Sequence, residues 1–374
     1  MDADRARRLA AQIRGLASDG LGWVGYASAV DDALRRVVRF DRSCWHSVDP
    51  GTVLFTGSLN RDVGCAGSWL AEHEYVIEDV NKWAFLAHSG RRAAATSIAT
   101  HGDLSRSARH RSHTAYGIGD ELRAAFVADD VYWAAAGFLR NESEPWFTED
   151  EVRLLAELTR AIATGARRTL VINHVEDLVP AVDGPGVVVF DPAGRPEFLS
   201  PAAERWIDEL IEEPRPAAPG ESKIVHAVAA RARAGAADAD PLQLAARSRV
   251  RTRSGSWLLL YGSLLSGGHP GRTAVVIQPA SASDVAPVVA LAYGLSAREC
   301  AVTSLCIEGR LTKDIAERLH LSIYTVQDHL KSIFDKTGVR SRGELVGQVF
   351  LQHYLPRWEN LSQPPAGWHG YAER

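Results

Sequence analysis

A stretch near the carboxyl end of the chain places apolar and polar side chains on opposite sides of one predicted helix. The apolar side holds Ile323, Val326, Leu330, Ile333 and Phe334. The polar side holds Tyr324, Gln327, Asp328, Lys331 and Asp335. A helix that is buried on one side and carries amide, carboxylate and ammonium groups on the other can bind base edges in the DNA major groove. The spacing therefore predicts a base-reading helix.

The start of this helix suits a phosphate group. Ser322 is a predicted N-cap, and the free amides of the first turn form an anion site. Thr325 can donate a hydrogen bond to phosphate from the same turn. A tight turn at Leu321 joins this helix to an earlier one, which starts after Thr312. Helix, short turn and second helix is the helix-turn-helix plan.

Capping residues predict two further helices around this pair. Capping boxes at Ser296–Glu299 and Ser341–Glu344 open a helix before and a helix after the helix-turn-helix. Gly338 closes the base-reading helix, as expected of a C-terminal glycine. We therefore expect an all-α domain of four helices over residues 284–355, followed by a loose C-terminal tail over 356–374.

The stretch from Leu295 to Val346 resembles the DNA-binding domain of LuxR/FixJ-type transcription regulators. The residues that carry the resemblance are Leu295, Ser296, Arg298, Glu299, Gly309, Lys313, Ile315, Ala316, Leu321, Ser322, Thr325, Val326, His329, Leu330, Ile333, Lys336, Val339, Arg340 and Arg342. In that family the position after Thr-Val and its neighbours touch bases. The resemblance therefore implies base contacts from Gln327, Asp328 and Lys331.

The resemblance also implies a wider DNA-binding set. The residues expected to bind DNA are Thr312, Lys313, Ser322, Tyr324, Thr325, Gln327, Asp328, Lys331, Lys336 and Arg340. The sequence departs from the family pattern at Gln327, where Lys is usual, and at Thr337, where Leu is usual. Asp328 is acidic in a surface that meets phosphates. These departures concern target sequence and affinity rather than fold.

Charge indicates that one copy of this domain binds DNA weakly. Residues 296–351 contain eight Lys/Arg and seven Asp/Glu, a balance of +1, and non-specific affinity comes from neutralised phosphates. We therefore expect specific DNA binding to require a homodimer. By analogy with the family, the dimer contact is expected from Leu345, Val346, Val349 and Phe350. Core packing of the same side chains is the alternative.

The remainder of the chain reads as two α+β units. Residues 1–172 follow the order helix, strand pair, helices, strand pair and long helix, which resembles a GAF sensor domain. Residues 180–280 predict two strands, small helices and three antiparallel strands, which resembles a PAS domain. The fold class is thus multi-domain: an α+β GAF-like domain, an α+β PAS-like domain and an all-α LuxR-type helix-turn-helix domain. Chains of this order are known among bacterial, especially actinobacterial, regulators.

Tryptophans suggest where a small molecule could bind. Six of the ten tryptophans lie in the first unit. We expect Trp45, Trp69, Trp83 and Trp133 to line a pocket for a small, largely apolar or aromatic effector. Ordinary core packing is the other interpretation of each of these side chains.

Histidines in the first unit raise a metal hypothesis that their neighbours oppose. His110 and His113 would share a helix face, but Arg106, Arg109 and Arg111 crowd the same stretch and would repel a cation. We expect no metal site and an exposed, anion-attracting surface instead. The sequence names no cofactor.

Composition is that of an ordinary soluble protein. The chain has 374 residues, 46% hydrophobic and 24% charged, with a net charge of −4. Its four cysteines are too sparse for a secreted, disulfide-stapled protein of this size. The longest apolar stretch, Val285 to Leu295, is well short of the roughly 20 residues needed to cross a bilayer. These features predict a cytoplasmic protein that does not bind membranes.

Together these features predict a transcription regulator whose sensor unit responds to a small ligand or partner and controls dimeric binding to double-stranded DNA. No GxSxG, Walker loop, HExxH or Gly-rich dinucleotide turn is present, so we do not expect an enzyme. One alternative is a GAF/PAS scaffold that dimerises and contacts a protein partner without a ligand. Another is an interaction protein whose helix-turn-helix contacts RNA polymerase.

Overall fold

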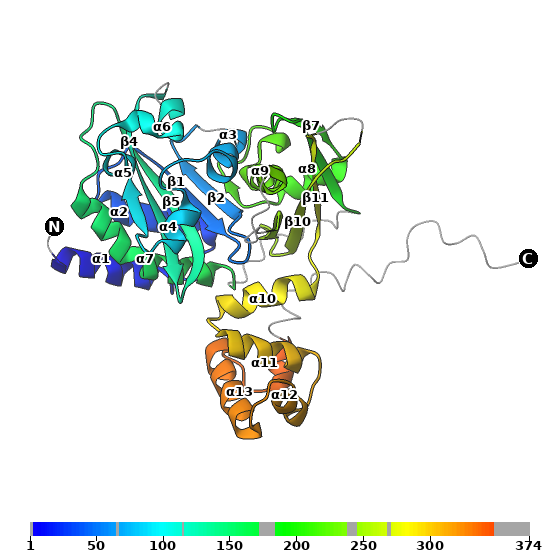
Figure 1. Cartoon of the computed structure of the whole chain (residues 1–374). Coiled ribbons are helices and arrows are strands. Elements are labelled where there is room, and N and C mark those ends of the chain that lie inside the picture. Colours follow the sequence, from blue (N-terminus) through cyan, green and yellow to red (C-terminus); the bar gives the residue numbers. More distant parts are fainter. Residues whose placement is uncertain are drawn as a thin grey trace, which may run out of the picture.

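Two α+β units lie side by side, and a group of helices hangs below them (Figure 1). The computed structural model describes residues 3–64, 67–113, 116–171, 184–237, 245–267 and 271–347. The fold class is thus a multi-domain α+β part followed by a helical C-terminal domain, as predicted. Among the helices in these ranges, none is both long and apolar enough to cross a bilayer.

The first sheet has six strands in the order β3-β4-β5-β1-β2-β8. Its strands are β1 (Arg42–Val48), β2 (Phe55–Arg61), β3 (Ala93–Ala95), β4 (Ile118–Ala128), β5 (Val131–Asn141) and β8 (Glu212–Glu213). The predicted hairpin at β4 and β5 is confirmed. Asp129 and Asp130 both adopt a positive φ, near 52° and 59°, which the tight turn between these strands requires.

Helices cover both faces of the first sheet. Along the chain they are α1 (Ala3–Leu16), α2 (Trp23–Arg35), α3 (Gly67–Ala71), the π-helix η1 (Glu72–Val76), α4 (Trp83–His88), α5 (Thr96–Ala99), the 3₁₀ turn η2 (Leu104–Arg106), α6 (Ala108–His113) and α7 (Glu149–Thr169). α1, α2 and α7 pack on one face through apolar residues such as Ile13, Val30 and Ile162. Thr148 and Glu151 form a capping box at the start of α7.

The second sheet has five antiparallel strands in the order β7-β6-β11-β10-β9, which confirms the predicted strand number. Its elements are β6 (Gly186–Phe190), β7 (Pro196–Leu199), α8 (Pro201–Asp208), the 3₁₀ turn η4 (Pro219–Glu221), α9 (Lys223–Ala237), β9 (Arg247–Arg251), β10 (Trp257–Leu264) and β11 (Thr273–Pro279). Residues 212–221 contain three prolines, which predict a loop, but the structure also forms the two-residue strand β8 there. β8, the two residues before Pro214, pairs in parallel with β2 of the first sheet.

The two α+β units share one hydrophobic core. Helix α9 packs on α3 and η1 of the first unit and on β10 and β11 of the second. One apolar cluster therefore runs from Phe55 and Leu70 through Val228 to Leu260. A buried ion pair also joins the units: Arg249 on β9 donates to both carboxylate oxygens of Asp49, at 2.6 and 2.8 Å. These contacts make the two sheets one packed body.

The C-terminal helices have a core of their own. They are α10 (Ala282–Ala292), α11 (Ala297–Ile307), α12 (Thr312–Arg318), α13 (Ile323–Thr337) and α14 (Arg342–Val346). Val302, Ile315 and Val326 are fully buried among them. The domain boundaries at 1–172, 180–280 and 284–355 stay predictions, and the predicted tail over 356–374 lies outside the described residues.

Candidate nucleic-acid interface

Helices α12 and α13 form the predicted helix-turn-helix. Ser322 caps α13 by accepting a hydrogen bond from the amide of Thr325 at 3.0 Å, and its hydroxyl lies 2.8 Å from that of Thr325. Gly338 ends the helix in the left-handed region, with φ at 73°. Both predicted ends of α13 are therefore confirmed.

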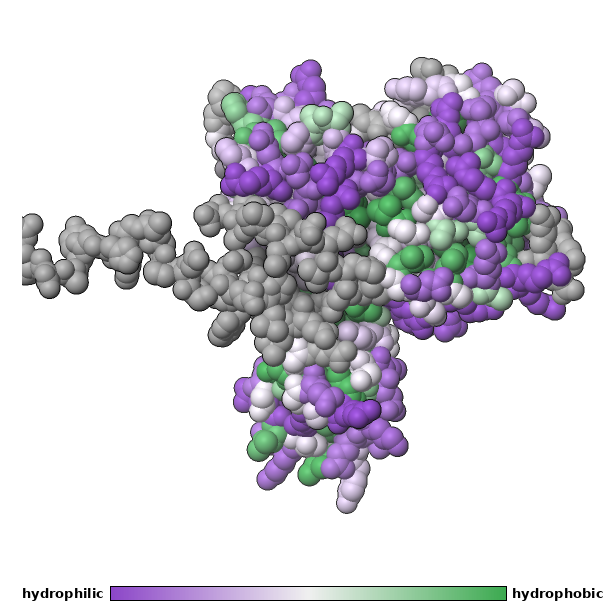
Figure 2. All heavy atoms as spheres, turned by 180° about the vertical axis from the view of Figure 1, so that it is seen from behind, coloured by the Kyte–Doolittle hydropathy of each residue, from purple (hydrophilic) through white to green (hydrophobic). Residues whose placement is uncertain are grey.

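Helix α13 has one buried and one exposed face. Val326, Leu330 and Ile333 are buried against α11 and α12. Ile323, which the sequence placed on the apolar face, is 45% exposed because it starts the first turn of α13. Tyr324 is 79% exposed beside it. Seen from behind, this domain has a mostly hydrophilic surface with a few apolar patches (Figure 2).

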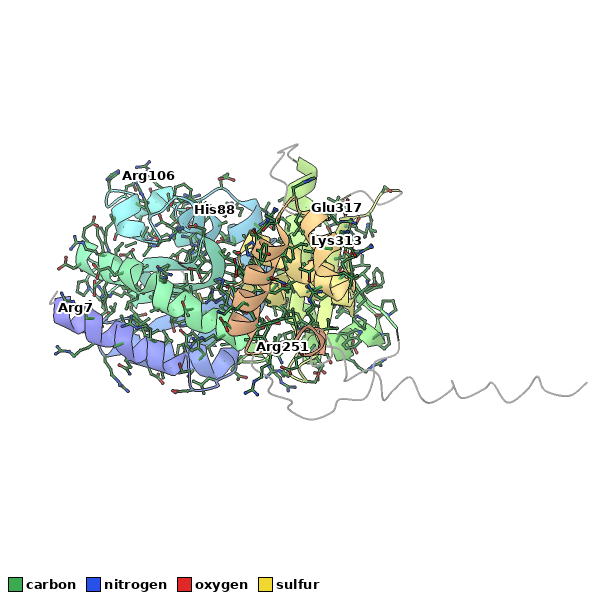
Figure 3. The ribbon with its side chains drawn as sticks, turned by 90° about the horizontal axis from the view of Figure 1, so that it is seen from below. Arg7, His88, Arg106, Arg251, Lys313 and Glu317 are labelled. Atoms are coloured by element: carbon green, nitrogen blue, oxygen red, sulfur yellow. The ribbon has the colours of Figure 1, made fainter. Side chains whose placement is uncertain are left out.

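The exposed face of α13 borders a hollow of about 540 Å³. The hollow is lined by Thr312, Gln327, Leu330, Lys331, Phe334, Asp335, Val339 and Arg340. It brings together four residues from the predicted DNA-binding set. Lys313 is exposed on α12, one turn from Glu317, in the view from below (Figure 3). Asp328 is also exposed on α13.

Comparison with known proteins identifies this part of the chain. Residues 294–348 match the family described as "Bacterial regulatory proteins, luxR family". The C-terminal domain is a luxR-family domain. A 57-residue stretch is 40% identical to the "Monoamine regulon transcriptional regulator" of Klebsiella aerogenes. That match covers 15% of this chain and a quarter (25%) of the relative's length.

Solved structures resemble the chain only weakly. The phage VqmA–DPO complex gives a TM-score of 0.18 at 16% identity, over 48% of this chain and 90% of that one. The DhaR(N)–DhaL complex of E. coli gives 0.23 at 12% identity, over 75% of this chain and 91% of that one. Scores this low do not establish a shared arrangement of domains.

Lys336 has a role in the luxR-family domain that the sequence did not indicate. Its ammonium group lies 2.7 Å from a carboxylate oxygen of Glu299, which is 4% exposed. Ser332 donates to the other oxygen at 2.6 Å, and the amide of Ser296 donates to the first at 2.6 Å. Glu299 thus joins the capping box of α11 to α13. Lys336 thus anchors α13 to α11, and its contact with DNA stays a prediction.

This carboxylate should make the luxR-family domain sensitive to acid. Desolvation acts to raise the pKa of Glu299, but hydrogen bonds from Lys336, Ser332 and Ser296 outweigh it and lower the pKa from 4.5 to about 2. A carboxylate with a lowered pKa stabilises the fold above its unfolded value and loses this contribution as pH falls. Glu299→Gln should therefore lower the protection of α13 amides against hydrogen exchange at pH 7. The difference from wild type should shrink between pH 4.5 and 2, and a difference that is constant with pH would contradict this assignment.

The last described helix bears on the predicted dimer contact. Leu345 on α14 is fully buried in the core of the domain, which favours the alternative of core packing for this side chain. Val346 is partly buried, and Val349 and Phe350 lie outside the described residues. Arg342 ties α14 to α12 by donating to the carbonyl of Arg310 and the hydroxyl of Thr312.

The four candidate tryptophans do not surround one common pocket, which corrects the sequence-based prediction. Trp45 and Trp133 belong to the core beneath α1, α2 and α7. Trp83 and Trp69 pack in the core on the opposite face of the first sheet. Neighbouring positions of a strand point to opposite faces, so tryptophan density along the sequence says little about a shared pocket. Trp45 stacks on Phe126 at 5.5 Å, as in an ordinary core.

Charged residues that look exposed in the sequence are buried on the Trp83 face. Arg109, expected on an anion-attracting surface, is 1% exposed and pairs with Asp79 and Glu121. Arg123 pairs with Glu74 at 2.8 Å and stacks on Trp83 at 3.5 Å. In the described part of the chain, no cluster of three or more His, Cys, Asp or Glu could hold a metal ion.

His46 lies beside this network and is fully buried. Its ring stacks on Phe55 at 4.3 Å, and neither ring nitrogen has a hydrogen-bond partner among the described residues. Burial, together with nearby Lys223 and Arg123, lowers the pKa of His46 well below its usual value. The sequence analysis missed this network of buried charges because charged residues are rarely buried. The alternation of Glu121 and Arg123 along β4 was a sequence signal that could have revealed it.

Proposed function

We propose that this protein is a DNA-binding transcription regulator whose α+β units control a luxR-family domain. The observation that carries the proposal is the exposed face of α13, with Gln327 and Lys331 beside Arg340 and Thr312. A helix capped by Ser322 and held from behind by Glu299 can enter the major groove as a rigid reader. Base readout by Gln327, Asp328 and Lys331, and phosphate contacts from Lys313, Tyr324 and Thr325, belong to this proposal.

The active form in this proposal is a homodimer. The balance of +1 over residues 296–351 gives each domain little non-specific affinity, so two copies must act together. Two base-reading helices about 34 Å apart match half-sites one helical turn apart. A pseudo-palindromic operator is therefore expected.

The α+β units serve as GAF-like and PAS-like sensor domains in this proposal. A six-stranded sheet with helices on both faces and a five-stranded antiparallel sheet with α8 and α9 support these assignments. An effector shifts DNA binding only if it has different affinities for two arrangements of the chain. A protein partner that binds the same units without a small ligand is the competing form of this proposal.

Selection of bound duplexes from a random DNA library by the full chain tests the proposal. An enriched motif with two inverted half-sites, protected in footprinting at moderate salt, is the expected result. The region upstream of the protein's own gene is a natural second target. Failure to enrich any motif, while the chain is folded by circular dichroism, would overturn DNA binding. Protection of one isolated half-site by a monomer would overturn the homodimer but not DNA binding.

A further inference from the structure

The first turn of α13 carries two large side chains that the fold leaves exposed. Ile323 is 45% exposed and Tyr324 is 79% exposed, although Val326 and Leu330 on the same helix are buried. The domain lies in front of the α+β units when the molecule is seen from below (Figure 3), and the exposed fractions show that these units leave the turn open. A ligand that covered the apolar surface of Ile323 would therefore gain hydrophobic free energy.

Polar groups of the same turn hold its shape. The Ser322 hydroxyl accepts from the Thr325 amide at 3.0 Å and lies 2.8 Å from the Thr325 hydroxyl. Ile323 is the first residue of the helix after this cap. In a helix-turn-helix, the residues at the amino end of the second helix contact base edges. The cap thus fixes the backbone that presents Ile323 where base contacts are made.

The spacing along α13 places Ile323 next to a base-reading residue. Ile323 and Gln327 are four residues apart, so they are neighbours on one face of the helix. Gln327 borders the hollow of the candidate interface, one turn before Lys331. The rise over four residues is about 6 Å, which corresponds to about two steps of stacked base pairs. Ile323 therefore meets a base one or two positions from the base that Gln327 contacts.

The chemistry of an isoleucine side chain favours one base over the others. It neither donates nor accepts a hydrogen bond, so a polar base edge that packs against it loses water without gaining a partner. In the major groove, cytosine presents an amino donor, and adenine and guanine present N7 and a second polar group. Thymine is the base that presents a methyl group there. The exposed surface of Ile323 is thus matched to thymine.

We propose that Ile323 is a specificity-determining residue that packs on the C5-methyl group of a thymine in each half-site. This thymine lies one or two base pairs from the base pair that Gln327 contacts. The inference deepens the proposed function and rests on it, since it requires α13 to lie in the major groove. It gives a role to a side chain that periodicity alone placed on the buried face of the helix.

Deoxyuridine in place of thymine tests the contact, because it removes the methyl group and keeps base pairing. The full chain is titrated by fluorescence anisotropy against its selected operator and against duplexes with one thymine replaced at a time. At one position of a half-site, the replacement should weaken binding about fourfold, as expected for one buried methyl group. Replacement in both half-sites should weaken binding about 15-fold, since the two contacts are independent. Thymines outside the protected half-sites are the matched DNA control and should give no change.

Three variants assign the methyl contact to Ile323. Ile323→Ala should bind the thymine and deoxyuridine operators equally, because its side chain is too short to reach the methyl group. Ile323→Val keeps a branched side chain and should keep a preference for thymine of at least about twofold. Phe198→Ala removes a 68% exposed apolar side chain from β7 of the second unit and should keep the full preference. Thermal melts show that each variant is folded.

Three results would overturn the inference. They are a selected motif without thymine in its half-sites, a set of half-site positions at which deoxyuridine never weakens wild-type binding, and a folded Ile323→Ala variant that keeps the wild-type preference. Each of these results requires DNA binding, so each leaves the proposed function in place. A folded chain that selects no motif would instead overturn the proposed function, and the thymine contact with it.

Discussion

Replacing Asp49 by Ala should lower the free energy of unfolding of the joined α+β units by about 3–5 kcal/mol. The Asp49 carboxylate is fully buried and accepts from the backbone and guanidinium of Arg249, and from the amide of Gly51. Without it, the 7% exposed guanidinium of Arg249 is left without its counter-ion in the interior. Urea unfolding followed by circular dichroism measures the loss.

Three further variants make this prediction specific. Glu157→Ala removes an exposed carboxylate from α7 and should change stability by less than about 0.5 kcal/mol. Asp49→Asn keeps two hydrogen-bonding atoms and should lower the free energy of unfolding by less than Asp49→Ala does. Asp49→Ala combined with Arg249→Met should recover part of the loss, because no buried charge then lacks a partner. A loss below about 1 kcal/mol for Asp49→Ala alone would show that the ion pair does not hold the units together.

Lys331→Ala should weaken binding to the selected operator by about 1–3 kcal/mol, or about 5- to 150-fold. Lys331 is exposed at the hollow on α13 and forms no hydrogen bond or ion pair with the described residues, so truncation removes a contact to DNA and not a contact within the fold. Discrimination at one base pair of each half-site should be lost with it. Fluorescence anisotropy on the operator and on single-base variants measures both quantities.

Two control variants, one of an arginine and one of a lysine, separate base contact by Lys331 from the effects of net charge and of domain stability. Arg91→Ala removes the same charge from an exposed position of the first unit and should leave operator affinity within about twofold. Lys336→Ala should reduce affinity through lost stability of the domain, because it releases Glu299. Wild-type affinity in a folded Lys331→Ala variant would rule out its contact with a base.

Much of the C-terminal domain could be predicted because its signals are local. Ser296 and Ser322 cap their helices through amides three residues away, and Gly338 takes the left-handed conformation that ends α13. Periodicity found the buried residues of α13 except at its first turn, where Ile323 has no neighbour to cover it. The hairpins, and the number of strands in the second sheet, were predictable for the same reason.

The features that only the tertiary structure decided all depend on residues far apart in the chain. Arg249 and Asp49 are 200 positions apart, and Lys336 reaches Glu299 across 37 positions. No periodicity links such pairs, because the backbone between them can follow many paths until the sheets and helices pack. The division of Trp45 and Trp83 between two sheet faces and the entry of β8 into the first sheet arise in the same way. Local sequence thus determined which helices and strands form, whereas packing between distant segments determined which side chains meet.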